Sequence, residues 1–278
     1  MGFIVLNHLI VLIGLPWYLL TNTTPASLWW FALAAFFAAG ISITVLYHRM
    51  YSHKAFALKN KVVEGILLFF STLATQGSAI FWSSYHRRHH GKLDTDDDPY
   101  SVKEGFWHAH IGWMFKPRVR HHLSDVPDLA KNKLVVFQEQ NYPLLVLGVN
   151  VLVAGVAAVV SGDVLGAFLI VWMLRQFVQF HTTWFVNSIA HTFGAKSYSK
   201  ELSAVDNYFI SLLTFGEGYH NYHHAFESDY RNGIKWYHYD PGKWLIWLFD
   251  KAGWVQYKKE VRHEVVMKRL LRSAKNIL

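Results

Sequence analysis

The stretch His86-Arg87-Arg88-His89-His90 is the part of this sequence around which the rest is organised. On a helix, residues three and four positions apart share a face, so these three imidazoles can converge on one point. Imidazole is the commonest metal-ligating side chain, although one such cluster beside two arginines could equally be a solvated basic turn. The same spacing returns in His220-Asn221-Tyr222-His223-His224, and His48 and His53 form a further pair. Three clusters in one chain indicate a metal site.

The composition indicates a membrane protein. Of the 278 residues, 52% are hydrophobic and 17% aromatic, and mean hydropathy is +0.14. This is more apolar than an average soluble domain, and the apolar residues form long runs. The absence of cysteine excludes disulfides, thiolate metal sites and iron–sulfur clusters. The net charge of +8 would suggest nucleic acid in a soluble protein, but the charges are distributed as in a membrane protein, and we expect no nucleic-acid partner.

Four apolar runs are long enough to cross a bilayer core of about 30 Å at about 1.5 Å per helical residue. They are residues 3–20, 28–46, 143–161 and 164–186. The short links 21–27 and 162–163 join them into two hairpins and contain no Lys or Arg. Apart from Arg175, every Lys and Arg lies after His48 and outside the spans, so the positive-inside rule places the ends of both hairpins in the cytoplasm. We expect Arg175 to be a structural hydrogen-bonding residue inside the bundle.

Residues 62–82 form a fifth run that is long enough to cross. A single crossing here would place His53 and His86 on opposite sides of the bilayer. Glu64, Gln76 and several small polar residues favour an interfacial or re-entrant segment. The sequence therefore predicts one domain over residues 1–278, an all-α integral membrane protein. Its four transmembrane helices form two hairpins, and a cytoplasmic helical cap carries a histidine-rich site for two metals.

The other polar clusters favour structural roles. The acidic loop 94–98, followed by Pro99, is expected to be a solvated turn and not a carboxylate ligand site. A second set of histidines lacks the triplet spacing, so we expect packing, interfacial or substrate contacts from its members. They are His108, His110, His121 and His122.

The number of histidines points to two metals. The three clusters hold eight, and His191 is a ninth, four positions after Asn187, so that both can point the same way. Nine neutral ligands exceed what one four-coordinate zinc requires and suit two metals of coordination number five or six, iron among them. Two irons beside a membrane suggest O2 activation and attack on a lipid C–H bond. Hydrolysis usually needs a carboxylate base, and none is evident in the clusters.

These motifs resemble those of the membrane-bound fatty acyl desaturases, specifically the stearoyl-CoA (Δ9) type. The family pattern is HxxxxH, HxxHH, N-S-x-x-H and HNxHH. It is matched in order by His48–His53, His86–His90, Asn187–His191 and His220–His224, the last preceded by Gly216-Glu217-Gly218. The resemblance covers nearly the whole chain.

The resemblance implies a site and a reaction. The nine histidines would ligate two irons, with Asn187 reaching one through a water, and no catalytic residue is implied apart from these ligands. They are His48, His53, His86, His89, His90, His191, His220, His223 and His224. Gln76 and Trp82 resemble residues that shape a kinked acyl tunnel. The reaction would use O2 to form a cis double bond. Because these residues contain no cytochrome b5 segment, an external ferredoxin, rubredoxin or cytochrome b5 is expected to supply electrons.

The acyl carrier stays open. The animal acyl-CoA enzymes have an arginine and an aspartate at positions that resemble those of Ser84 and Tyr85 here, and that arginine contacts CoA. Here Lys116, Arg118 and Arg120 could bind CoA phosphates instead, or they could meet lipid headgroups. Acyl-CoA is the first expectation, with an acyl carrier protein or a glycerolipid as alternatives.

Two other functions compete. A membrane diiron lipid or alkane hydroxylase would share the metal chemistry, but the Asn187–His191 segment and the Gly216-Glu217-Gly218 lead-in resemble desaturases. A metal transporter would be expected to place ionisable ligands near the bilayer midplane. The predicted spans contain no string of such ligands.

Overall fold

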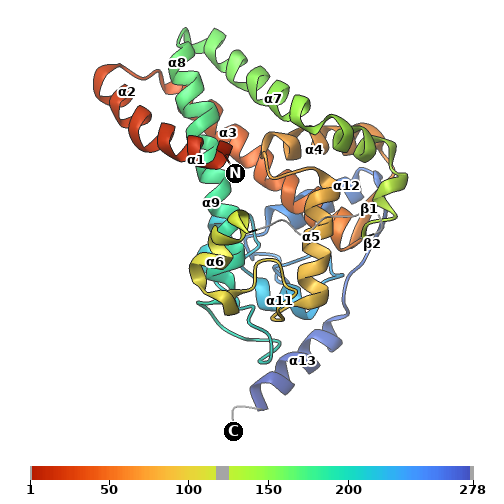
Figure 1. The fold of residues 1–278 in the computed structure, drawn as a ribbon. Coiled ribbons are helices and arrows are strands. Elements are labelled where there is room, and N and C mark those ends of the chain that lie inside the picture. Colours follow the sequence, from red (N-terminus) through yellow and green to blue (C-terminus); the bar gives the residue numbers. More distant parts are fainter. Residues whose placement is uncertain (1, 117–124, 276–278) are drawn as a thin grey trace.

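The computed structural model describes residues 2–116 and 125–275, and four long apolar helices dominate it (Figure 1). Each is long and apolar enough to cross a membrane. The first joins α1 (Gly2–Leu9), η1 (Ile10–Gly14) and α2 (Leu15–Thr21); the second joins α3 (Ala26–Ser42) and η2 (Ile43–Ser52). The third is α7 (Lys133–Ser161), and the fourth joins α8 (Val164–Gly166), η7 (Ala167–Leu174), α9 (Arg175–Ser188) and η8 (Ile189–His191). Four membrane-spanning helices in two hairpins were therefore predicted correctly.

The first and third helices expose broad apolar faces. Leu20 and Val159 are 87% and 85% exposed. Leu12 and Leu152 are also exposed on these helices. Because lipid chains are the solvent that such side chains favour, these faces fit contact with the bilayer core.

Both hairpin tips lie at one end of the structure, opposite α5 and α11 (Figure 1). α7 ends at Gly162, whose φ of +72° favours glycine. The side chain of Asp163 accepts a hydrogen bond from the Gly166 amide at 2.7 Å and another from the Tyr18 hydroxyl of the first hairpin. The tips of the two hairpins are thus joined directly.

α7 begins ten residues before the predicted span. The prediction started at Pro143, which lies inside the helix. The preceding residues are mostly polar and extend the helix beyond its apolar part. Asn132 caps this extension by accepting the Leu134 amide at 3.1 Å.

Residues 62–82 do not form one helix. They contain α4 (Lys61–Leu73) and the start of α5 (Ala79–Lys92), separated by a turn in which Thr75 and Gly77 have φ of 57° and 97°. Neither helix is among the four that could cross a membrane. The chain therefore turns back at this point, so that His53 and His86 lie on the same side.

Arg175 and Gln176 hold this turn from the fourth long helix. Arg175 donates to the Leu73 carbonyl at 2.9 Å, and Gln176 donates to the Ala74 carbonyl at 2.6 Å. Arg175 also donates to the Asn150 side chain. The last carbonyls of a helix lack partners within it, so these donors complete the end of α4. The expected structural role of Arg175 is confirmed.

The remaining elements form the cap. Its one sheet within the described residues was not predicted: β1 (Phe56–Leu58) pairs antiparallel with β2 (Val255–Lys258). The long-range pairing attaches the C-terminal part to the residues that follow η2. The other cap elements are η3 (Val102–Glu104), α6 (Phe106–His110), η4 (Gly112–Phe115), η6 (Leu129–Lys131), α10 (Tyr208–Leu213), α11 (His220–Ala225), α12 (Pro241–Lys251) and α13 (His263–Lys275).

Candidate metal centre

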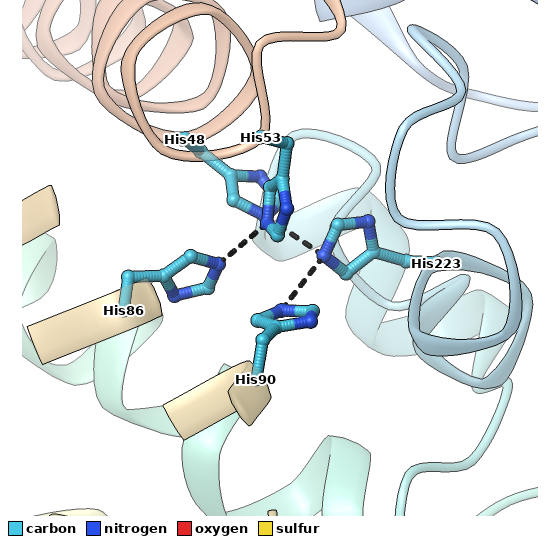
Figure 2. A group of neighbouring side chains, drawn as sticks. All are labelled: His48, His53, His86, His90 and His223. Atoms are coloured by element: carbon cyan, nitrogen blue, oxygen red, sulfur yellow. Dashed lines mark hydrogen bonds between the residues drawn. The ribbon is translucent and has the colours of Figure 1, made fainter. Parts of the chain in front are cut away.

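All nine predicted histidines meet where the long helices join the cap. They form two groups, within each of which one ring nitrogen per residue lies within 4.8 Å of the others. The five-histidine group consists of His48, His53, His86, His90 and His223, and the four-histidine group of His89, His191, His220 and His224. Figure 2 shows the five-histidine group, in which the rings from η2, from His53 directly after it, and from α5 and α11 point toward one another.

Each HxxHH box divides between the two groups. On α5, His86 and His90 are four residues apart and serve the five-histidine group, whereas His89 serves the other. On α11 the assignment is reversed, because His220 and His224 share the four-histidine group and His223 joins the first. Positions i and i+4 share a helix face more closely than i+3 does, which explains the division. The triplets thus converge on two neighbouring points instead of one.

The rings face inward through Nε2. Among the five, His48 Nε2 lies 3.0 Å from His223 Nε2, and His53 Nε2 lies 2.8 Å from His86 Nε2. Among the four, His220 Nε2 lies 3.0 Å from His191 Nε2. Nitrogens converging in this way are the donor set expected of a borderline transition metal.

Burial favours the neutral form of six of these imidazoles. It lowers the pKa of a whole set of ring nitrogens well below the usual 6.5, and mutual repulsion adds to the effect. The set comprises His53, His86, His220, His223 and His224. Burial likewise lowers the pKa of His90 to about 4. A neutral ring keeps a lone pair for a metal, so the site fits two metals held entirely by nitrogen.

Carboxylates lie behind several of these rings, a feature that the sequence analysis missed. Asp98 Oδ1 lies 2.8 Å from His89 Nδ1, and Glu217 Oε2 lies 2.9 Å from His48 Nδ1. The expectation of a solvated acidic loop holds for the exposed Asp96 and Asp97 but is wrong for Asp98, which is 2% exposed. A buried carboxylate needs partners, and the position of Asp98, nine residues after His89, supplies one.

Glu217 is held in a buried charge network. Burial raises its pKa, but the neighbouring His48 and Arg49 side chains outweigh burial and lower the pKa to about 2. Arg49 donates to Asp240 Oδ1 at 2.8 Å and lies 3.5 Å from Glu217 Oε1. The network therefore connects the N-terminus of α12 to the five-histidine group.

A largely apolar cavity of about 450 Å³ reaches both histidine groups. It is lined by His48 and His86 of the five-histidine group and by His220 of the four-histidine group. Asn187 lines it as well. A substrate in the cavity would therefore lie beside both groups.

Gln76 and Trp82 also line the cavity, where they take part in a hydrogen-bonded chain across it. Trp82 Nε1 donates to Gln76 Oε1 at 3.3 Å, and Gln76 Nε2 donates to Thr183 Oγ1 at 2.7 Å. Thr183 was not identified from the sequence, because only the fold brings α9 against the turn before α5.

Of the predicted basic contacts, Lys116 lies within the described residues. Lys116 is exposed, pairs with Glu104, and is not among the residues lining the cavity. Arg118 and Arg120 lie outside the described residues, as do His121 and His122. Ser84 donates to Asp125 Oδ2 at 2.8 Å.

His108 and His110 belong to neither histidine group. His110 is buried against His181 and Ser188, with contacts of 3.0 Å to each. His108 lies 3.5 Å from Glu104. Packing and hydrogen bonding thus describe His110, whereas His108 lies beside a carboxylate.

The comparisons with known proteins agree on one family. A family model described as fatty acid desaturase matches residues 27–259. The probable acyl-CoA desaturase of Schizosaccharomyces pombe is 38% identical over 254 residues, 88% of this chain and 53% of that protein. The sn-1 stearoyl-lipid 9-desaturase of Anabaena variabilis is 35% identical over 75% of this chain and 74% of that protein. Stearoyl-CoA desaturase 5 of Bos taurus is 30% identical over 92% and 78%. The chain thus spans about half the length of the fission yeast relative.

Proposed function

Because the chain belongs to the fatty acid desaturase family, we propose that it is an O2-dependent desaturase that places a cis double bond, of the Δ9 type, in a saturated fatty acyl chain. The observation that carries this proposal is the meeting of nine converging imidazoles with an apolar cavity. His48, His86 and His220 line that cavity together with Gln76 and Trp82. An acyl chain held there would have its C–H bonds beside both histidine groups.

The two histidine groups would each hold one iron, with Asn187 directed at the centre through a water molecule. Bound iron would supply the activation of O2 and the oxidising power that breaks two C–H bonds. The saturated chain gives up two hydrogen atoms, the donor gives two electrons and solvent gives two protons, so that O2 leaves as two water molecules. The protein's contribution is to hold the chain, to exclude bulk water and to fix which carbons face the metals.

Acyl-CoA is the proposed form of the substrate. The fission yeast and bovine relatives are named as CoA-dependent desaturases, which supports this choice. A lipid-linked chain is the second candidate, because the Anabaena relative is named as a lipid desaturase. In addition, Ser84 stands at a position that resembles that of an arginine in the animal acyl-CoA enzymes. Purified protein supplied with stearoyl-CoA or with a stearoyl glycerolipid would separate the two.

The electron donor is proposed to be an acidic ferredoxin, rubredoxin or cytochrome b5. The chain carries a net charge of +8, and its basic residues lie outside the apolar spans except Arg175. Opposite charge on a donor would speed its encounter with this face.

The proposed orientation places the histidine groups on the cytoplasmic side of the membrane. In that case single cysteines at positions 22 and 163, in place of Asn22 and Asp163 at the two hairpin tips, are expected to react with a membrane-impermeant reagent added outside the cell. Single cysteines can be introduced at these positions because the chain has none. Cytoplasmic labelling of either tip would reverse or break the two-hairpin topology.

Replacing Gln76 with leucine should change where the double bond forms. The leucine has a similar size but removes both hydrogen bonds that connect Trp82 to Thr183. The acyl chain then loses a fixed bend, and we expect a mixture of positional isomers at reduced rate. Derivatised products analysed by mass spectrometry report bond position directly. Unchanged regiochemistry would remove Gln76 from the positioning machinery.

The function itself is tested by gas chromatography–mass spectrometry of total fatty acids from cells expressing the chain, with all three donor types supplied. New cis-monounsaturated chains are expected, and they should be absent with the variant His89→Ala. Hydroxylated lipid in their place would identify a hydroxylase. Iron uptake without any lipid product would favour the transporter.

A further inference from the structure

The outer nitrogens of the histidine rings are not all supported in the same way. In the five-histidine group, His48 Nδ1 faces Glu217 at 2.9 Å and His90 Nδ1 faces Glu227 at 3.1 Å. In the four-histidine group, Asp98 lies 2.8 Å from His89 Nδ1. His191 Nδ1 has only a hydroxyl, that of Ser203, at 2.7 Å.

A carboxylate at Nδ1 decides which nitrogen is available to a metal. An ionised carboxylate can only accept a hydrogen bond, so the Nδ1 that faces it carries the ring proton. The lone pair then belongs to Nε2, the nitrogen that points into the group. A serine hydroxyl can donate or accept and therefore does not specify the tautomer. Carboxylates also raise the basicity of the ring they support.

Two of the three carboxylates are rigidly built into the protein. Glu217 is 8% exposed and accepts from Asn232 Nδ2 at 2.8 Å and from the Thr44 hydroxyl. Asp98 is 2% exposed and accepts from the amides of Tyr100 and Asp94 at 3.2 and 3.3 Å. These additional hydrogen bonds fix the direction of each carboxylate toward its ring.

Glu227 differs, because its side chain is 58% exposed. Solvent therefore screens its charge. Glu217 is thus the buried carboxylate of the five-histidine group. Within the described residues, Asp98 is the carboxylate that contacts a ring of the four-histidine group.

We infer that Glu217 and Asp98 are positioning residues that divide the centre between them, Glu217 governing the metal of the five-histidine group and Asp98 that of the four-histidine group. The inference rests on the proposed two-metal centre and goes beyond it by assigning one supporting carboxylate to each metal. Neutralising one of these carboxylates should therefore weaken the binding of its own metal and leave the other metal bound.

The isosteric variants Glu217→Gln and Asp98→Asn test this assignment, with Asp97→Asn as the matched control, because the Asp97 side chain is 60% exposed and pairs with Arg88 and Lys92. An amide can present its NH2 group to Nδ1, which draws the ring proton to Nε2 and removes the lone pair from the metal. Support of this kind is typically worth about 10–100-fold in metal affinity. Full-length protein is loaded anaerobically with 57Fe2+ and equilibrated with graded concentrations of a chelator.

Iron per chain and the Mössbauer spectrum are then measured. Wild type and Asp97→Asn should retain two irons and two quadrupole doublets. Glu217→Gln and Asp98→Asn should each retain one iron at a chelator concentration that leaves wild type full, and the doublet that disappears should differ between them. Unfolding would remove both irons, so selective loss separates a positioning role from a general structural one.

The inference is overturned if both variants keep two irons at wild-type affinity, if both lose the same doublet, or if each loses both irons. These outcomes differ from a failure of the proposed function. Wild type holding fewer than two irons would contradict the two-metal centre itself. Wild type with two irons and no unsaturated product would contradict the desaturase assignment and leave the division of the carboxylates standing.

Discussion

Replacing His223 with alanine is expected to reduce double-bond formation by more than about 100-fold, the upper end of the loss for a residue that only supports a ligand. His223 Nε2 contacts the Nε2 atoms of His48 and His90 at 3.0 and 3.2 Å, so it joins rings from η2 and α5 (Figure 2). Its removal takes a nitrogen from the middle of the five-histidine group. The measurement is product per mole of membrane-inserted protein.

His263→Ala is the matched control, because His263 is exposed on α13 and belongs to neither histidine group. It should keep wild-type turnover and iron content. The His223→Ala protein should insert in the membrane normally and carry less than two irons per chain. Substantial turnover in this variant would remove His223 from the set of ligands.

Replacing Arg49 with methionine should cause the largest loss of stability of any single change considered. Arg49 is 1% exposed and lies against two carboxylates, with Asp240 Oδ1 at 2.8 Å and Glu217 Oε1 at 3.5 Å. It also donates to the Tyr230 carbonyl at 2.9 Å. Removing one partner of a buried ion pair leaves an uncompensated charge and typically costs about 3–5 kcal/mol.

The corresponding shift in the unfolding midpoint is about 10 °C for a chain of this size. It is measured on metal-free protein, so that loss of iron does not contribute. Arg88→Met is the control, because Arg88 meets Asp97 at 3.6 Å with both side chains substantially exposed, and we expect about 0–1 kcal/mol. A double variant with Asp240→Asn should lose less than the sum of the single losses, since the two side chains share one network. Equal losses for Arg49→Met and Arg88→Met would show that the buried network contributes nothing to stability.

The sequence predicted those features that depend on local composition and spacing. Length and hydropathy identify a membrane helix without knowledge of the fold, and the recurrence of the HxxHH spacing predicted six of the nine histidines that the structure brings together. The polar residues of 62–82 favoured a segment that does not cross the membrane. Its division into α4 and α5 was missed, because the break at Thr75 and Gly77 is stabilised by Arg175, about one hundred residues away.

The features that were missed depend on long-range contacts or on burial. Glu217 was recognised as part of a motif, but its contact with His48 joins residues 169 positions apart. Asp98 was grouped with its exposed neighbours because composition alone cannot separate one buried aspartate from a run of solvated ones. The pairing of β1 with β2 involves two strands of three and four residues, too short to produce a periodic signal.

The most direct test of the central claim is a single-turnover measurement on purified protein of known iron content. Iron-loaded protein is reduced, saturated with a saturated acyl substrate and exposed to 18O2, and the double bonds, iron and 18O in the lipid are quantified. The expected result is two irons per chain, one cis double bond per chain for each pair of electrons supplied, and no 18O in the lipid. Double bonds formed by protein that holds one iron or none, or 18O retained in the product, would contradict a desaturase built on two histidine groups.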